Sequence, residues 1–172
     1  MVNIDAIYNE ISNLYRLLPE DDTPIPLELR SGSMGLRAKD YICAAAIIEN
    51  NGFQHYLPQI QLTGQAVELA LKSCIASVGI EPPRGYRGHD LVDLYRTVQA
   101  HGFEIEEREF AAIVHLNHIF FEDLSTDTRY KSRYPTDNNE SLGGVVPKNE
   151  VYDAIVNKLV SLAKGKVKNG TA

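Results

Sequence analysis

The fold is decided by residues 58–78, whose sequence is PQIQLTGQAVELALKSCIASV. Apolar residues recur there at steps of three and four, so a helix of about 31 Å would carry one continuous apolar stripe. Pro58 suits the first turn of such a helix, because the N–H that proline lacks is not needed there. The stripe comprises Val67, Ala70, Leu71, Cys74, Ile75 and Val78. We therefore predict that residues 58–78 form the central helix of the protein.

The helical period continues on both sides of this stretch, and no segment shows sustained strand-like alternation. Residues 19–33 contain three prolines and are expected to form an irregular connection. Other helices are expected over 4–18, 35–50 and 104–122, from His89 and Asp90 to Gly102, and from Pro147 to Gly165. The pattern predicts an all-α antiparallel bundle with extra terminal helices.

The chain is accordingly divided into three parts. They are an N-terminal helix with its connecting loop (1–35), a helical bundle (36–164) and a flexible tail (165–172). In the helix over 35–50 the residues expected to face inward are Leu36, Cys43, Ala44, Ile47 and Ile48. In the last two helices they are Phe110, Ile113, Val114, Leu116, Phe120, Val151, Ile155, Leu159 and Leu162.

Length and composition place the chain among ordinary globular proteins. It has 172 residues, of which 44% are hydrophobic and 23% charged, which suits one domain. Its longest apolar run, 42–48, is far shorter than the roughly 20 residues that cross a bilayer. Only two cysteines occur, so we expect neither a disulfide framework nor a zinc site, and we expect a cytoplasmic location.

The charge is unevenly distributed. The net charge is −6, which argues against strong nonspecific binding of nucleic acid by the whole molecule. Five of the 17 Lys and Arg residues lie in two short loops, and the other 12 face 23 Asp and Glu residues, which leaves −11. The five are Arg84, Arg87, Arg129, Lys131 and Arg133. The loops either hold an anion together or are merely solvated.

Few residues suggest chemistry by themselves. Gln65, Glu68 and Lys72 form a polar line on the central helix, which an exposed ion pair would explain equally well. His115 and His118 share a helix face, but a metal site is not expected there. Asp40 is most simply a partner for a helix dipole. The common hydrolase, zinc-protease and dinucleotide-binding motifs do not occur, and no cofactor is expected.

Three blocks of sequence, taken together, carry a family resemblance. They are QAVELALK at 65–72, GHDL at 88–91 with Leu94, and RYP at 133–135. In this order and spacing they resemble the HEPN family, the nucleotide-binding domains of higher eukaryotes and prokaryotes. The resemblance implies an up-and-down four-helix bundle, commonly a homodimer, found beside nucleotidyltransferase domains, in toxin–antitoxin pairs and in defence or stress systems. The first helix and the long loop at 124–146 would be additions.

The resemblance is to members that do not cut RNA. Ribonuclease members carry Arg, four to six residues and then His near the start of the last core helix, and that helix has no His here. One Arg-x4-His spacing, Arg84 to His89, lies in the earlier loop before the helix that His89 and Asp90 open. The leading hypothesis is therefore a binding module for a nucleotide, RNA or partner protein. Its expected site residues are Arg84, Arg87, His89, Arg129, Tyr130, Arg133 and Tyr134.

Two alternatives stay open. One is a metal-independent endoribonuclease that uses Arg84 and His89, and the other is a purely structural dimer. In the structural case the Arg and Tyr residues would only fix the long loop to the bundle. Residues 129–135 are in either case expected to lie against the central helix near Glu68, because a buried Arg needs a carboxylate partner.

Overall fold

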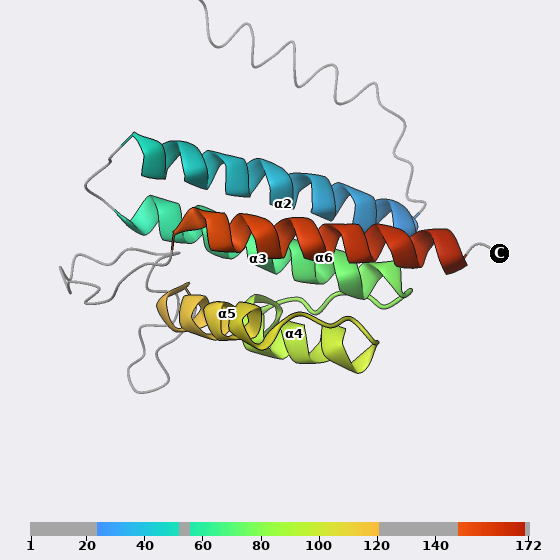
Figure 1. The fold of residues 1–172 in the computed structure, drawn as a ribbon. Coiled ribbons are helices and arrows are strands. Elements are labelled where there is room, and N and C mark those ends of the chain that lie inside the picture. Colours follow the sequence, from blue (N-terminus) through green and yellow to red (C-terminus); the bar gives the residue numbers. More distant parts are fainter. Residues whose placement is uncertain (1–23, 52–55, 121–147, 171–172) are drawn as a thin grey trace, which may run out of the picture.

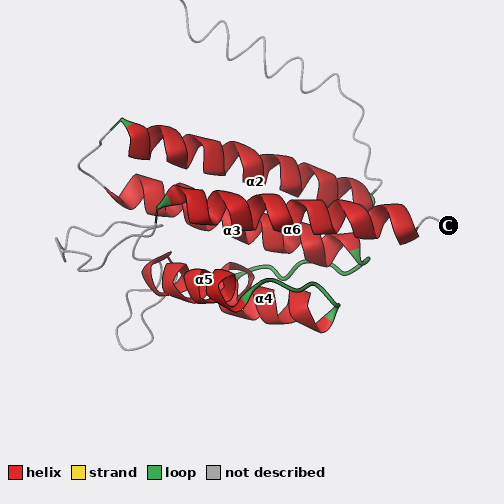
Figure 2. Ribbon diagram, in the orientation of Figure 1, coloured by secondary structure: helices red, strands yellow, loops and turns green. Residues whose placement is uncertain are grey.

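The computed structural model describes residues 24–51, 56–120 and 148–170. These residues form five α-helices and one short 3-10 helix, and they contain no strand (Figures 1 and 2). The helices are α2 (Leu27–Asn50), α3 (Tyr56–Ser77), α4 (Leu91–Ala100), α5 (Glu107–Phe120) and α6 (Asn149–Gly170), with η1 (Tyr86–His89) directly before α4. The predicted all-α class is confirmed. The helix expected over 4–18 lies outside the described residues.

Helix α3 is the centre of the bundle, as its sequence predicts. It contacts α2, α4, α5 and α6, and Figure 1 shows it between α2 on one side and the pair α4 and α5 on the other. Val67, Ala70, Leu71 and Cys74 are completely buried. The Cys74 thiol donates to the carbonyl of Leu159 at 3.3 Å, and burial raises its pKa to about 12. None of the described helices is long and apolar enough to cross a membrane.

Helix α6 runs parallel to α3 and antiparallel to α2. Asn149 at its start is buried and joins all three helices. Its side-chain N–H donates to the carbonyl of Ile42 at 3.1 Å, and its side-chain oxygen accepts from Thr63 at 3.3 Å. Its backbone N–H donates to the carboxylate of Glu49 at 3.2 Å. Asn149 therefore fixes the start of α6 against α2 and α3.

Helix α2 begins at Leu27, well before the expected start at Gly35. The residues assigned to a connection, SGSMG at 31–35, are helical because small side chains let three helices approach closely. Ser31 and Ser73 each donate a hydroxyl to the other's carbonyl, at 2.9 and 2.8 Å. A Cβ on Gly35 would lie 3.1 Å from Val160. Packing has thus overridden the low helix propensity of Gly and Ser.

This packing also reverses the predicted orientation of α2. Its buried residues are Ser31, Gly35, Ala38, Ile42 and Ala45. Leu36 and Ile47, expected inside, are each 62% exposed, and Cys43 is exposed as well. The inward positions expected for Val114, Val151 and Leu162 are also wrong, since all three side chains are exposed. The prediction assumed that the largest apolar residues face the core, whereas the inner face of α2 consists of small residues and one large one, Ile42.

The last helix extends beyond its expected end. Gly165 lies inside α6, which continues to Gly170, so the expected tail at 165–172 is helical over most of its length. A Cβ on Gly165 would meet nothing within 4 Å, so the glycine is not required there for packing. Glycine in a helix costs only about 1 kcal/mol relative to alanine, which the packing of the preceding turns offsets.

Candidate functional site

The carboxylate of Glu68 is the centre of a polar cluster inside the bundle. Glu68 lies on α3 with its side chain only 4% exposed. One oxygen accepts from Lys72 Nζ at 2.8 Å, one turn later on the same helix. The other lies 3.0 Å from Nδ1 of His89, in the 3-10 helix before α4. In the polar line predicted on α3, Glu68 and Lys72 thus form an ion pair that is largely buried. His89, from the 3-10 helix, joins this pair.

The loop between α3 and α4 brings His89 to this carboxylate by turning back along α3. Glu68 lies more than two turns before the end of α3, so α4 begins beside the middle of that helix (Figure 1). Gly85 has φ 68°, a conformation that favours glycine, where the loop enters η1. A Cβ on Gly88 would lie 2.4 Å from the carbonyl oxygen of Pro83. Both glycines are therefore needed for the path that places His89.

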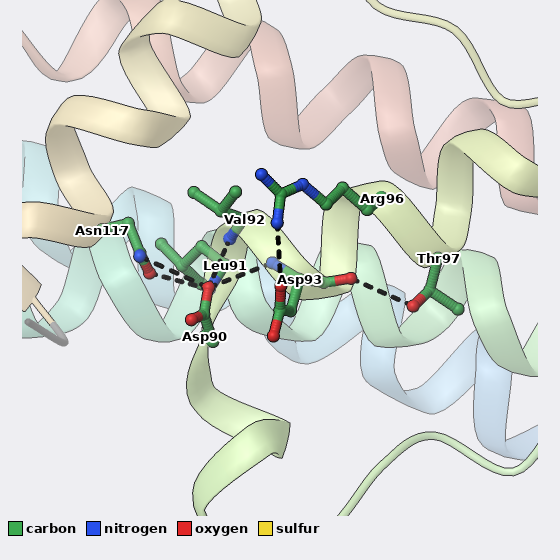
Figure 3. Close-up of polar contacts among 7 residues, drawn as sticks. All are labelled: Asp90, Leu91, Val92, Asp93, Arg96, Thr97 and Asn117. Atoms are coloured by element: carbon green, nitrogen blue, oxygen red, sulfur yellow. Dashed lines mark hydrogen bonds and ion pairs between the residues drawn. The ribbon is translucent and has the colours of Figure 1, made fainter.

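Asp90 caps the N-terminus of α4. Its carboxylate oxygen accepts from the N–H groups of Val92 and Asp93 at 2.9 and 3.0 Å (Figure 3). The side-chain oxygen of Asn117, from α5, accepts from the first N–H of α4, that of Leu91, at 2.8 Å. The side-chain N–H of Asn117 donates to the Asp90 carboxylate at 3.4 Å. The donors that could hold a phosphate at this helix end are already satisfied by the protein's own oxygens.

Replacing Asp90 with alanine is expected to lower the free energy of unfolding by about 1 to 2 kcal/mol, the usual range for losing such a cap. The loss arises because two N–H groups of α4 and the Asn117 amide lose one acceptor. Chemical denaturation of the two proteins measures it. Asp93→Ala is the control, since the Asp93 side chain is 54% exposed and pairs with Arg96 at the surface (Figure 3). Equal losses in both variants would contradict the capping role.

Arg84 lies at the outer side of the same loop. Its side chain is 82% exposed and donates to Glu81 at 3.0 Å, while Arg30 of α2 grips the same carboxylate at 2.6 and 2.8 Å. These hydrogen bonds, chiefly those from Arg30, hold the pKa of Glu81 at about 2. Arg84 and His89 therefore have separate carboxylate partners, Glu81 and Glu68.

The other predicted site residues are only partly placed. Arg87 belongs to η1, and nothing is described of its side chain. Gln65 is half-buried and lines a shallow hollow with Tyr41 and Gln61, apart from the Glu68 cluster. The residues expected from the long loop lie outside the described residues, as does the predicted contact of that loop with Glu68. They are Arg129, Tyr130, Arg133 and Tyr134.

Two predictions about single residues can be compared with the structure. Asp40 lies in the middle of α2, so its predicted place at a helix start is wrong, because α2 begins earlier. His115 and His118 lie on α5, the first half-buried and the second exposed. Among the described residues no group of three or more His, Cys, Asp or Glu side chains is arranged to hold a metal ion.

Asn117 is not among the residues that the sequence predicts for the site. It is 5% exposed, between the buried residues Leu116 and Ile119. Its signal was a polar residue four positions after Ile113 on the apolar face of a helix, since a buried amide implies partners nearby. Those partners are the Leu91 N–H and Asp90, so GHDL at 88–91 is connected to α5 as well as to α3.

Each residue of GHDL now has a structural role. Gly88 permits close approach to Pro83, His89 joins Glu68, Asp90 caps α4, and Leu91 is completely buried. A buried carboxylate at Nδ1 also fixes the orientation of the His89 ring, which is 20% exposed. Glu68 thus holds the imidazole of His89 and the ammonium group of Lys72. The exposed guanidinium of Arg84 lies in the same loop as His89.

Comparison with known proteins gives one match. The family model described as HEPN domain matches residues 35–162, from the third turn of α2 to a point inside α6. No curated protein and no solved structure matches the chain.

Proposed function

This chain belongs to the HEPN domain family, and from that premise we propose that it is a binding module for phosphate-bearing ligands, a nucleotide or RNA. The observation that carries the proposal is the loop at 81–90, which is tied to α3 through His89 and Glu68 while the Arg84 side chain, paired with Glu81, is 82% exposed. A guanidinium on a fixed backbone suits phosphate, because it offers paired donors without first ordering the chain. Arg87 and the second basic loop would complete the site.

The geometry supports binding more than cleavage. A ribonuclease that used Arg84 and His89 would need both groups on one phosphodiester, but the two side chains have different partners in two different places. His89 is also 20% exposed, against 82% for Arg84. The endoribonuclease and the purely structural dimer are retained as outcomes of the tests below.

The setting of the module is part of the same proposal. We expect a cytoplasmic homodimer that acts with a nucleotidyltransferase or an antitoxin in a toxin–antitoxin, stress or defence system. These expectations rest on the family alone. Size-exclusion chromatography with light scattering tests the dimer, and the genes beside this one test the partner.

Binding is expected to be weak and sensitive to salt, and to fall about fivefold on Arg84→Ala, the loss of roughly 1 kcal/mol. Arg87→Ala and Arg133→Ala should reduce it similarly. Calorimetry with nucleotides and with a short RNA at low salt measures the affinities. The matched control is Arg108→Ala, because its side chain is 83% exposed and also pairs with a nearby glutamate, Glu106.

The same RNA incubations, analysed on a denaturing gel, separate the alternatives. Intact RNA with Arg84-dependent binding supports the binding module. Cleavage that is lost in both Arg84→Ala and His89→Ala would replace it with the ribonuclease. No binding, or binding reduced as much by Arg108→Ala as by Arg84→Ala, would leave the structural dimer.

A further inference from the structure

The side of α2 that faces away from α3 and α6 carries large apolar side chains. Leu29 is 67% exposed, Leu36 and Ile47 are each 62% exposed, and Cys43 is also exposed. We call these four residues the outer face of α2. They follow one another at steps of seven, seven and four, so they lie on one side of the helix, with the polar residues Ser33 and Asp40 between them. Large apolar side chains gathered on one side of a surface helix indicate a partner that covers them.

The sequence before α2 contains a segment whose pattern fits the outer face. Residues 4–18 carry apolar residues at helical spacing, and three of them, Ile4, Ile11 and Leu18, repeat every seven positions. Leu29, Leu36 and Cys43 have the same repeat. A helix over 4–18 would therefore match the outer face in length, at about 21 Å from the first to the last of these residues on each helix.

The connection between the two favours an antiparallel pair. Only residues 19–26 separate Leu18 from the first residue of α2, and Pro19, Pro24 and Pro26 interrupt any helix there. Connections of two to eight residues usually join antiparallel neighbours in helical bundles. Antiparallel packing would place Leu18 against Leu29, Ile11 against Leu36 and Ile4 against Cys43.

One pair of opposite charges agrees with this register, since Glu10 comes to the level of Arg37. A second copy of the chain would have to compete with a segment on a short connection, whose effective concentration is in the millimolar range.

We propose that residues 4–18 form a helix that packs antiparallel on the outer face of α2 in the same chain and covers it. The proposal is independent of ligand binding, because it concerns the side of α2 that does not contact α3. It would make α2 and the preceding segment a helical hairpin added to the HEPN bundle, whose family match begins only at residue 35.

A cysteine at position 4 tests the register directly. In Ile4→Cys, mild oxidation should give a disulfide with Cys43 within one chain, seen as a monomer of increased mobility on a non-reducing gel. Ala6→Cys is the matched control, because its side chain would project from the opposite side of the helix. Oxidation that yields only covalent dimers would assign the outer face to a second copy, and equal cross-linking of both variants, or none, would overturn the proposal.

A second measurement uses Cys43 without any new cysteine. Cys43 should react slowly with a thiol reagent in the intact chain, and at least tenfold faster in Ile11→Asp, which places a charge among the apolar residues of the segment. Asn13→Asp adds the same charge on the opposite side of the segment and should leave the rate unchanged. Cys74 does not interfere, because it is buried. A rate that is already fast in the intact chain, or equal in the two variants, would overturn the proposal.

Discussion

Replacing Gly64 with alanine is expected to lower the free energy of unfolding by about 2 to 3 kcal/mol, the upper part of the usual range for overpacking a core. A Cβ at this position would lie 2.2 Å from Cδ2 of Phe120 and within 2.5 Å of two further ring atoms. Phe120 is 1% exposed, so the ring has no open space into which to move. Alanine is the better helix former by about 1 kcal/mol, and the clash is expected to outweigh that gain.

Gly165→Ala is the matched control, since it makes the same substitution inside α6 with nothing within 4 Å of the new Cβ. It should raise stability by up to about 1 kcal/mol. Urea denaturation followed by circular dichroism compares the two variants. Phe120→Leu should restore part of the loss when it is combined with Gly64→Ala, because a smaller side chain relieves the contact. Changes of the same sign at both glycines would show that the aromatic contact is not the cause.

The parts of the fold that the sequence predicts well are those in which a helix buries its largest apolar residues. Helix α3 is the clearest case. Leu71 and Ile75 are the largest side chains of its stripe, and they are at most 1% exposed. Helix α4 is another, since Asp90 precedes a run in which Leu91, Leu94 and Val98 all face inward. Local pattern and tertiary packing agree in both helices.

Helix α2 shows why the same rule fails elsewhere. The first half of its inner face is made of Ser31, Gly35 and Ala38, which a hydrophobicity pattern ranks below Leu36 and Ile47. The small residues let α3 and α6 approach α2 closely. Whether that approach is favourable depends on residues far away in sequence, Ser73 on α3 and Val160 on α6. No local pattern contains that information.

The candidate site was predictable in its residue types but not in its connections. Glu68, Lys72 and His89 were all singled out from the sequence, yet their junction depends on a loop that turns back along α3. That path requires the close contact of Gly88 with Pro83, which only a three-dimensional arrangement reveals. An up-and-down chain with direct connections would have left His89 near the end of α3, away from Glu68.

Replacing Glu68 with alanine is expected to lower the free energy of unfolding by about 3 kcal/mol, as for other buried ion pairs that lose one partner. Lys72, whose side chain is 14% exposed, and His89 would each lose a carboxylate oxygen at 3.0 Å or less. An exposed pair at the same helical spacing would be worth only about 0.3 to 0.5 kcal/mol. Chemical denaturation therefore distinguishes the two cases clearly.

Glu68→Gln and Glu81→Ala complete this test. Glutamine keeps the shape of Glu68 and one acceptor, so an intermediate loss is expected if charge and hydrogen bonding both matter. Glu81 holds the same loop through Arg30, but its side chain is 48% exposed, so the loss on Glu81→Ala should be smaller than on Glu68→Ala. A loss on Glu68→Ala below half a kcal/mol, or no greater than that on Glu81→Ala, would mean that the loop is held mainly from its outer side.

Because η1 carries both His89 and Arg87, a loop released from Glu68 should also bind phosphate ligands more weakly, even though Glu68 is itself an anion. That sign is informative, since simple removal of a negative charge near a basic loop would strengthen the binding.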